Sequence, residues 1–232
     1  MSGFWRFLRY GLLAIAALIA ILIAAPFILV GADRLYYSVV QYTHHYRLVL
    51  EIEDHGEIHT GSSVIGVSFS PPPPWFRNFF PTSRTRVRGE AVVVELSTGQ
   101  VVVATLMHGP KANASRMQSL ASRALGSSVS GGLREAPNWA GKAELTGSDI
   151  PTMILLPSLD DPFEGSWLAP DEFPEKIGPN VRFRRMTLEM TSDPVTRQIE
   201  EKLPLITQDR GAGDVVIGAD GQGIPLGIYL TR

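Results

Sequence analysis

Histidine is the residue type in this chain that is best suited to metal binding or acid–base catalysis, because the sequence contains no cysteine. Two of the five histidines, His55 and His59, have the i, i+4 spacing that places two imidazoles on one face of a helix. Their segment predicts a β-hairpin instead, where this spacing does not make two rings converge. We therefore predict no metal ion and no cofactor, and interpret both histidines as solvent-facing turn residues.

Serine motifs for covalent catalysis are incomplete. The stretches 61–66 (GSSVIG) and 126–131 (GSSVSG) both miss the G-x-S-x-G spacing, and no lysine follows a serine by three positions. The absence of cysteine excludes disulfides, thiolate catalysis and cysteine-ligated zinc. A triad assembled only by the fold would use His108 as its base, at the end of a predicted strand. The sequence therefore favours a non-catalytic function, and a membrane-tethered periplasmic hydrolase is the alternative.

Three arginines alternate with other residues in a segment that predicts a strand. Arg84, Arg86 and Arg88 are separated by Thr85 and Val87. Since successive side chains of a strand point to opposite faces, the three guanidinium groups share one face. Such a row suits an anionic partner, either lipid headgroups or an acidic protein surface, and a solvated strand face is the alternative.

The stretch SPPPPWFRNFF joins a proline run to the four aromatic residues Trp75, Phe76, Phe79 and Phe80. Four buried aromatic side chains cover about 600–1,000 Å², whereas soluble monomers rarely expose an apolar patch above about 300–600 Å². Some surface must therefore cover these rings. The alternatives are the domain's own core, a partner protein and the outer surface of a membrane.

The N-terminal part of the chain predicts a transmembrane helix over residues 11–30, an uncharged apolar run about 30 Å long as a helix. Arg6 and Arg9 precede this run, so residues 1–10 are expected in the cytoplasm and the bulk of the chain outside it. Aromatic residues flank both ends, as in a permanent span. The alternative is a cleaved signal peptide, for which Val30-Gly31-Ala32 would serve as the cleavage site.

Within this predicted helix, Ala16, Ala20 and Ala24 form a stripe of small residues at every fourth position. Small residues on one face allow another transmembrane helix to approach closely. We interpret the stripe as a packing surface for a partner helix. The alternative is a helix that is simply rich in alanine.

After a juxtamembrane segment over residues 31–45, residues 46–232 predict an exported α+β domain that is mostly antiparallel, with a possible subdivision near 126–147. Alternating and β-branched segments predict two successive hairpins, which we expect to form one four-stranded meander. A buried strand within 150–159 and another strand over 181–191 follow, and residues 214–230 predict a last hairpin that turns at Asp220-Gly221. Short amphipathic helices are expected over 115–125 and from Pro194, with Asp193 as its N-cap.

These features favour one function over two others. The net charge of −2 gives no attraction to nucleic acid. We expect a single-span protein of the bacterial inner membrane whose periplasmic domain is an accessory or interaction module. Its partners would be the bilayer and another membrane or envelope protein, and its oligomeric state is left open. Besides the hydrolase, a module that binds lipid or another envelope ligand is an alternative.

Overall fold

The computed structural model describes residues 2–74, 83–109, 112–126, 132–158, 165–202, 215–217 and 223–225 of the 232-residue chain. The chain divides into two units: residues 1–41 with 70–84 form the first, and residues 42–69 with 85–232 form the second. The predicted fold class is confirmed, since one long apolar helix precedes a mostly antiparallel two-sheet region with a few short helices. The aromatic residues Trp75, Phe76, Phe79 and Phe80 lie outside the described residues.

The first unit contains helix α1, Ser2–Val39, whose 38 residues span about 57 Å. The helix therefore extends beyond both ends of the predicted span over residues 11–30. Its segment Leu18–Val39 is long and apolar enough to cross a membrane. Residues 31–45, predicted as a juxtamembrane segment, lie mostly in two elements, because α1 continues to Val39 and the first strand begins at Tyr42.

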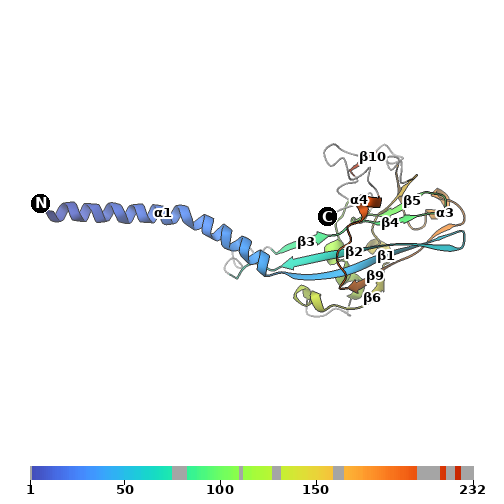
Figure 1. The fold of residues 1–232 in the computed structure, drawn as a ribbon, viewed down its shortest axis with the longest axis horizontal. Helices are drawn as coiled ribbons and strands as arrows, with labels where there is room; N and C mark the ends of the chain where they lie inside the picture. Colours follow the sequence, from blue (N-terminus) through green and yellow to red (C-terminus); the bar gives the residue numbers. More distant parts are fainter. Residues whose placement is uncertain are drawn as a thin grey trace. The chain divides into compact units, whose positions relative to one another are not determined.

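The second unit contains a five-stranded sheet in which the long strands β2, β1 and β9 lie side by side (Figure 1). Its order is β3 (Arg84–Arg88), β2 (Glu57–Ser70), β1 (Tyr42–Asp54), β9 (Val181–Thr191) and β6 (Lys142–Glu144). Strands β1 and β2 form the predicted hairpin, joined by His55 and Gly56. Both turn residues have positive φ, 52° and 87°, as a two-residue type I′ turn requires.

A second, four-stranded antiparallel sheet has the order β4 (Val92–Glu95), β5 (Val101–Ala104), β7 (Met153–Leu156) and β8 (Ser166–Leu168). The prediction of one four-stranded meander is therefore wrong, because the two hairpins lie in different sheets. All residues of β5 and β7 are buried. A β-branched run buried on both faces carries no alternation, so its sequence does not indicate which sheet it joins.

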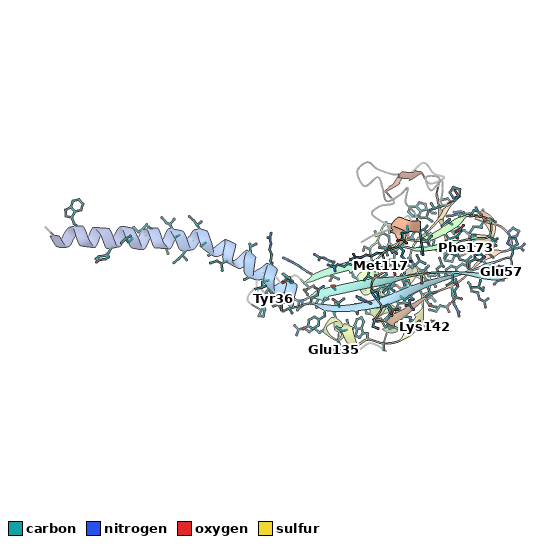
Figure 2. All side chains as sticks on the ribbon, viewed as in Figure 1. Tyr36, Glu57, Met117, Glu135, Lys142 and Phe173 are labelled. Carbon is teal, nitrogen blue, oxygen red and sulfur yellow. The ribbon has the colours of Figure 1, made fainter. Side chains whose placement is uncertain are left out.

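The two sheets share one hydrophobic core with two short helices, α2 (Met117–Leu125) and α3 (Phe173–Lys176). The inward-facing residues of β1 contribute to it at every second position: Tyr46, Leu48, Leu50 and Ile52 are all essentially inaccessible. Met117 and Phe173, labelled in Figure 2, are buried in the same core. A smaller cluster on the other face of the four-stranded sheet includes Val103, Ile154 and Ile199.

Residues 192–198 form an extended segment, which we call the strap, rather than the predicted helix from Pro194. Within the described part of this segment, residues 192–202, only Ile199–Lys202 are helical, as α4. Asp193 pairs with Arg47 of β1 instead of acting as an N-cap, and Thr196 exchanges hydrogen bonds with the backbone of Val64. The carboxylate of Glu90 accepts hydrogen bonds from the amides of residues 198 and 199. Long-range contacts thus override the local helix signal.

The remaining elements are short. Three 3-10 helices are η3 (Gly132–Arg134), η4 (Ala136–Asn138) and η5 (Gly147–Asp149). Strands β10 (Val215–Ile217) and β11 (Gly223–Pro225) pair in antiparallel fashion, as the C-terminal hairpin prediction requires. The turn between them lies outside the described residues.

Candidate functional site

The arginine row lies on β3, an edge strand, and its three side chains are exposed while Val87 packs against the core. Arg84 is already engaged, because its Nη2 lies 2.8 Å from the carboxylate of Asp33 and its guanidinium lies 3.8 Å from the centre of the Tyr37 ring. Arg86 and Arg88 form no ion pair with the part of the chain that the structure describes. Within the described residues, Arg86 and Arg88 are therefore the members of this row that an anionic partner could pair with.

The stripe of Ala16, Ala20 and Ala24 lies on α1, and all three residues are exposed. The large apolar side chains described on this helix are exposed as well, among them Leu18, Ile21 and Leu22. Water is a poor solvent for such a helix, which is long and apolar enough to cross a membrane. The stripe as a packing surface for another helix stays a prediction.

His55 and His59 lie beside a buried carboxylate that joins the two sheets. Oδ2 of Asp54, at the end of β1, accepts hydrogen bonds from the amide and hydroxyl of Ser97, at 2.8 and 2.6 Å. His55 Nδ1 lies 2.6 Å from Oδ1, and His59 Nε2 lies 3.8 Å from Oδ2. Burial would raise the pKa of Asp54, but the hydrogen bonds from Ser97 and His55 outweigh it and lower this pKa to about 2.

The two histidines have different environments. His55 is exposed, as predicted, whereas His59 is half-buried and its Nδ1 lies 2.9 Å from the carbonyl oxygen of Glu95. Among the described residues, no group of three or more histidine, aspartate or glutamate side chains is arranged to hold a metal ion. The Asp54 cluster is accordingly a structural contact between the β1–β2 turn and the β4–β5 turn.

His108 is fully buried, and neither of its ring nitrogens has a hydrogen-bond partner in the described ranges. Burial lowers the pKa of His108 to about 4, and the positive charge of Arg123 acts in the same direction. A catalytic base must reach the hydroxyl that it deprotonates. Asp149 lies close enough to act on the pKa of His108, but no hydrogen bond joins the ring to a serine hydroxyl among the described residues. A His108 triad therefore stays an alternative that rests on the sequence.

A cleft of about 490 Å³ lies in the second unit, at the end of the five-stranded sheet where β1 begins and β9 ends. Its walls are Thr43–His45, residues 190–192 and four residues of the segment 136–140. Figure 2 labels Glu135 and Lys142, which flank that segment in the sequence. The segment is held against the sheet because the amide of Met190 donates a hydrogen bond to the carbonyl oxygen of Gly141.

His44 is the polar side chain buried most deeply in this cleft. It is 4% exposed, and neither ring nitrogen has a hydrogen-bond partner within the described part of the chain. Its ring lies against the indole of Trp139, with the two centroids 5.1 Å apart. Burial lowers the pKa of His44 to about 4, and the neighbouring His45 acts in the same direction. At neutral pH this imidazole is therefore uncharged and offers one N–H donor and one nitrogen acceptor.

The sequence prediction missed His44, which it treated as an ordinary residue of the juxtamembrane segment. The signal that could have found it is the alternation of β1. Tyr46, Leu48 and Leu50 face the core, and two positions before Tyr46 the same phase reaches His44. Extending the strand to Tyr42 would have predicted a buried histidine.

Comparisons with known proteins give no relative: the chain matches no protein-family model, no curated protein and no solved structure. The function must therefore be argued from the molecule itself.

Proposed function

We propose that this chain is a single-span membrane protein whose C-terminal β domain is a non-catalytic docking module for another membrane protein. The observation that carries the proposal is α1, whose described apolar side chains, such as Leu18, Ile21 and Leu22, are exposed over more than half of their surface. A helix with this composition is stable when a bilayer solvates it. The charge bias of Arg6 and Arg9 supports a cytoplasmic N-terminus and a periplasmic domain in a bacterial inner membrane.

Two surfaces support the docking role. The exposed alanines of α1 leave room for a second helix to approach within the bilayer. In the second unit, Arg86 and Arg88 present two exposed guanidinium groups on an edge strand. Edge strands that carry cations resist indiscriminate strand pairing, and the same cations can bind an acidic surface.

Membrane integration is tested with the full-length chain carrying a reporter after Arg232. We expect the protein to stay in the membrane after alkaline extraction and a periplasm-dependent reporter, such as alkaline phosphatase, to be active. Replacing Leu22 and Ile23 by arginine places two charges in the apolar run, each opposing insertion by about 2.5–3.5 kcal/mol. This variant should move to the soluble fraction, and the mass of the wild-type protein should show that residues 1–32 are retained. A soluble wild type, or one cleaved near Ala32, would contradict the anchor.

Docking is tested by gentle solubilisation of two matched triple variants. In the first, Ala16, Ala20 and Ala24 become leucine; in the second, the off-stripe alanines Ala14, Ala17 and Ala25 do. Both variants add the same apolar volume, but only the first blocks close helix approach. We expect a defined partner to co-purify with the wild type and the second variant and to be lost from the first. Recovery of the wild type as a lone monomer in several detergents, or equal behaviour of the two variants, would overturn the docking role.

A further inference from the structure

The cleft at the end of the five-stranded sheet has a volume that is large enough for a small molecule. Its volume of about 490 Å³ falls within the range of about 300–1,000 Å³ that is usual for ligand pockets. Three separate stretches of sequence build its walls, and each is fixed by backbone pairing in the second unit: β1 pairs with β9, and the 136–140 segment leads into β6, which also pairs with β9.

His44 gives this cleft an unsatisfied hydrogen-bonding requirement. Most buried polar side-chain atoms in folded proteins have a partner, and a buried group without one destabilises the fold by about 1–3 kcal/mol. Both nitrogens of His44 lack a partner among the described residues, although the side chain is 4% exposed. The two nitrogens point away from each other, so a ligand group with a donor or an acceptor would satisfy one of them.

The lining of the cleft selects against charge. The described lining contains no aspartate, glutamate, lysine or arginine, and Asp193, which follows Ser192 in the sequence, pairs with Arg47. Nδ1 of His45, the other histidine of the lining, lies 2.7 Å from the carbonyl oxygen of Asp193. A charged ligand would lose its hydration without gaining a counter-ion, whereas a neutral ligand would not.

The rest of the lining is suited to an apolar body. Trp139 presents an indole beside His44, and Met190, Ala136 and Pro137 add apolar surface. Aromatic rings favour offset or edge-to-face contacts with other rings, and methionine adapts to irregular apolar shapes. Ring-shaped ligands therefore gain the most from these walls.

We propose that this cleft binds a neutral small molecule that combines an apolar ring with a hydroxyl or amide group, and that His44 is the residue that hydrogen-bonds the polar group. Trp139 and Met190 hold the ring. The inference goes beyond the docking role and does not depend on it, because every residue involved lies in the second unit.

The test uses the full-length protein in lipid nanodiscs, with isotope-labelled histidine, and benzamide as the probe. Benzamide has an aromatic ring, a donor and an acceptor, and a ligand of this size is expected to bind with a Kd of about 1 mM. We expect a saturable shift of the His44 ring-nitrogen resonances. Benzoate has nearly the same shape but a negative charge, and toluene lacks the polar group. Each should bind at least about tenfold more weakly, a difference of about 1.4 kcal/mol.

Two variants assign the effect. His44→Phe keeps an aromatic ring of similar size but has no nitrogen, so benzamide affinity should fall at least about tenfold. His108→Phe is the matched control, because His108 is also a buried histidine but does not line this cleft. Its benzamide affinity should equal that of the wild type. If His44→Phe does not fold, Trp139→Leu tests the same wall and should also weaken binding at least about tenfold.

Three results would overturn the proposal. One is the absence of a saturable His44 shift with benzamide, which would mean that water or another part of the chain satisfies the ring. The second is equal binding of benzamide, benzoate and toluene. The third is wild-type benzamide affinity in His44→Phe. None of these results bears on the membrane and docking experiments, so the two proposals fail independently.

Discussion

Each end of strand β1 carries a buried polar side chain, and the two side chains differ in their hydrogen-bond partners. Asp54, its last residue, is 1% exposed and is matched by Ser97 and His55. His44, near its start, is 4% exposed and has no hydrogen-bond partner among the described residues. Both side chains lie on the inward face of the same strand. At one end the sheets are joined through a satisfied carboxylate; at the other a cleft opens.

This difference separates a structural polar group from a candidate binding group. A buried charge that is fully hydrogen-bonded stabilises one arrangement of the chain and has nothing left to offer a ligand. A buried neutral ring without partners among the described residues destabilises the fold by about 1–3 kcal/mol and leaves its hydrogen-bonding capacity unused. Burial alone, which is nearly equal at the two positions, does not distinguish them.

The largest expected effect is that His44 and Asp54 lower the stability of the folded protein in different pH ranges. The pKa of His44 is about 4 in the folded chain against 6.5 for the free side chain, so the unfolded chain binds the proton more readily between these values. Stability is therefore fully present above about pH 6.5 and falls as the pH drops towards 4, by up to about 3 kcal/mol per histidine of this kind. Asp54 behaves differently: its contribution is present above about pH 3.8 and is lost only as the pH falls towards 2.

This separation is measured by chemical unfolding of the full-length protein in detergent at pH 7, 5 and 4. His44→Phe should reduce the loss of stability between pH 7 and pH 4, and so should His108→Phe, whose histidine has a similarly low pKa. The two effects should add, because the residues belong to separate sites. An unchanged loss in His44→Phe would mean that His44 has a partner in the folded protein.

A second, smaller effect concerns glycines of β2 that face the two halves of β1. Gly61 pairs with Leu50, towards the Asp54 end, and a Cβ added there would overlap the carbonyl oxygen of Val93 in the other sheet. Gly66 pairs with His45, near the cleft, where the closest atom would be a methyl group of Val195 at 2.8 Å. A backbone oxygen cannot move aside as easily as the end of a side chain.

Gly61→Ala should therefore destabilise the domain by about 1–3 kcal/mol, and Gly66→Ala by less than about 1 kcal/mol. Thermal unfolding of the two variants and the wild type under identical conditions makes the comparison. Equal destabilisation would show that the sheets approach each other no more closely at Gly61 than the strap approaches at Gly66.

Much of the fold follows from local patterns, and the elements that do not are instructive. The alternation over Arg47–Glu53 predicts which side chains of β1 face the core, and the apolar run over 11–30 predicts the helix. The division of the hairpins between two sheets is not predictable in this way, since the valines of β5 are buried on both faces. The helix expected from Pro194 fails because Arg47 and Glu90, distant in sequence, hold the strap and its end.

The candidate site was harder to predict than the fold, because it too depends on contacts between residues that are distant in the sequence. Residues that carry obvious chemistry, the His55 and His59 pair, lie near a carboxylate that is already satisfied. The cleft instead depends on Trp139 meeting His44 from a segment almost a hundred residues later in the sequence. Only tertiary structure brings an orphan imidazole and an indole together, and no spacing in the sequence records it.

The smallest expected effect comes from replacing Asp54 by asparagine. The amide oxygen can still accept the hydrogen bonds from Ser97, and the amide nitrogen can donate to Nδ1 of a neutral His55, so no partner is left empty. What is lost is the charge on the acceptor, and charged acceptors contribute more per hydrogen bond, so Asp54→Asn should reduce stability at pH 7 by about 1 kcal/mol. The variant should also lack the loss of stability between pH 3.8 and pH 2.

Glu53→Gln is the control, since its ion pair with Arg184 is 3.8 Å long and solvent-exposed, and its effect should stay within about 0.5 kcal/mol. If Asp54→Asn were no more damaging than this control and kept the acid transition, the carboxylate would not be what joins the two turns, and the contrast between the ends of β1 would rest on His44 alone.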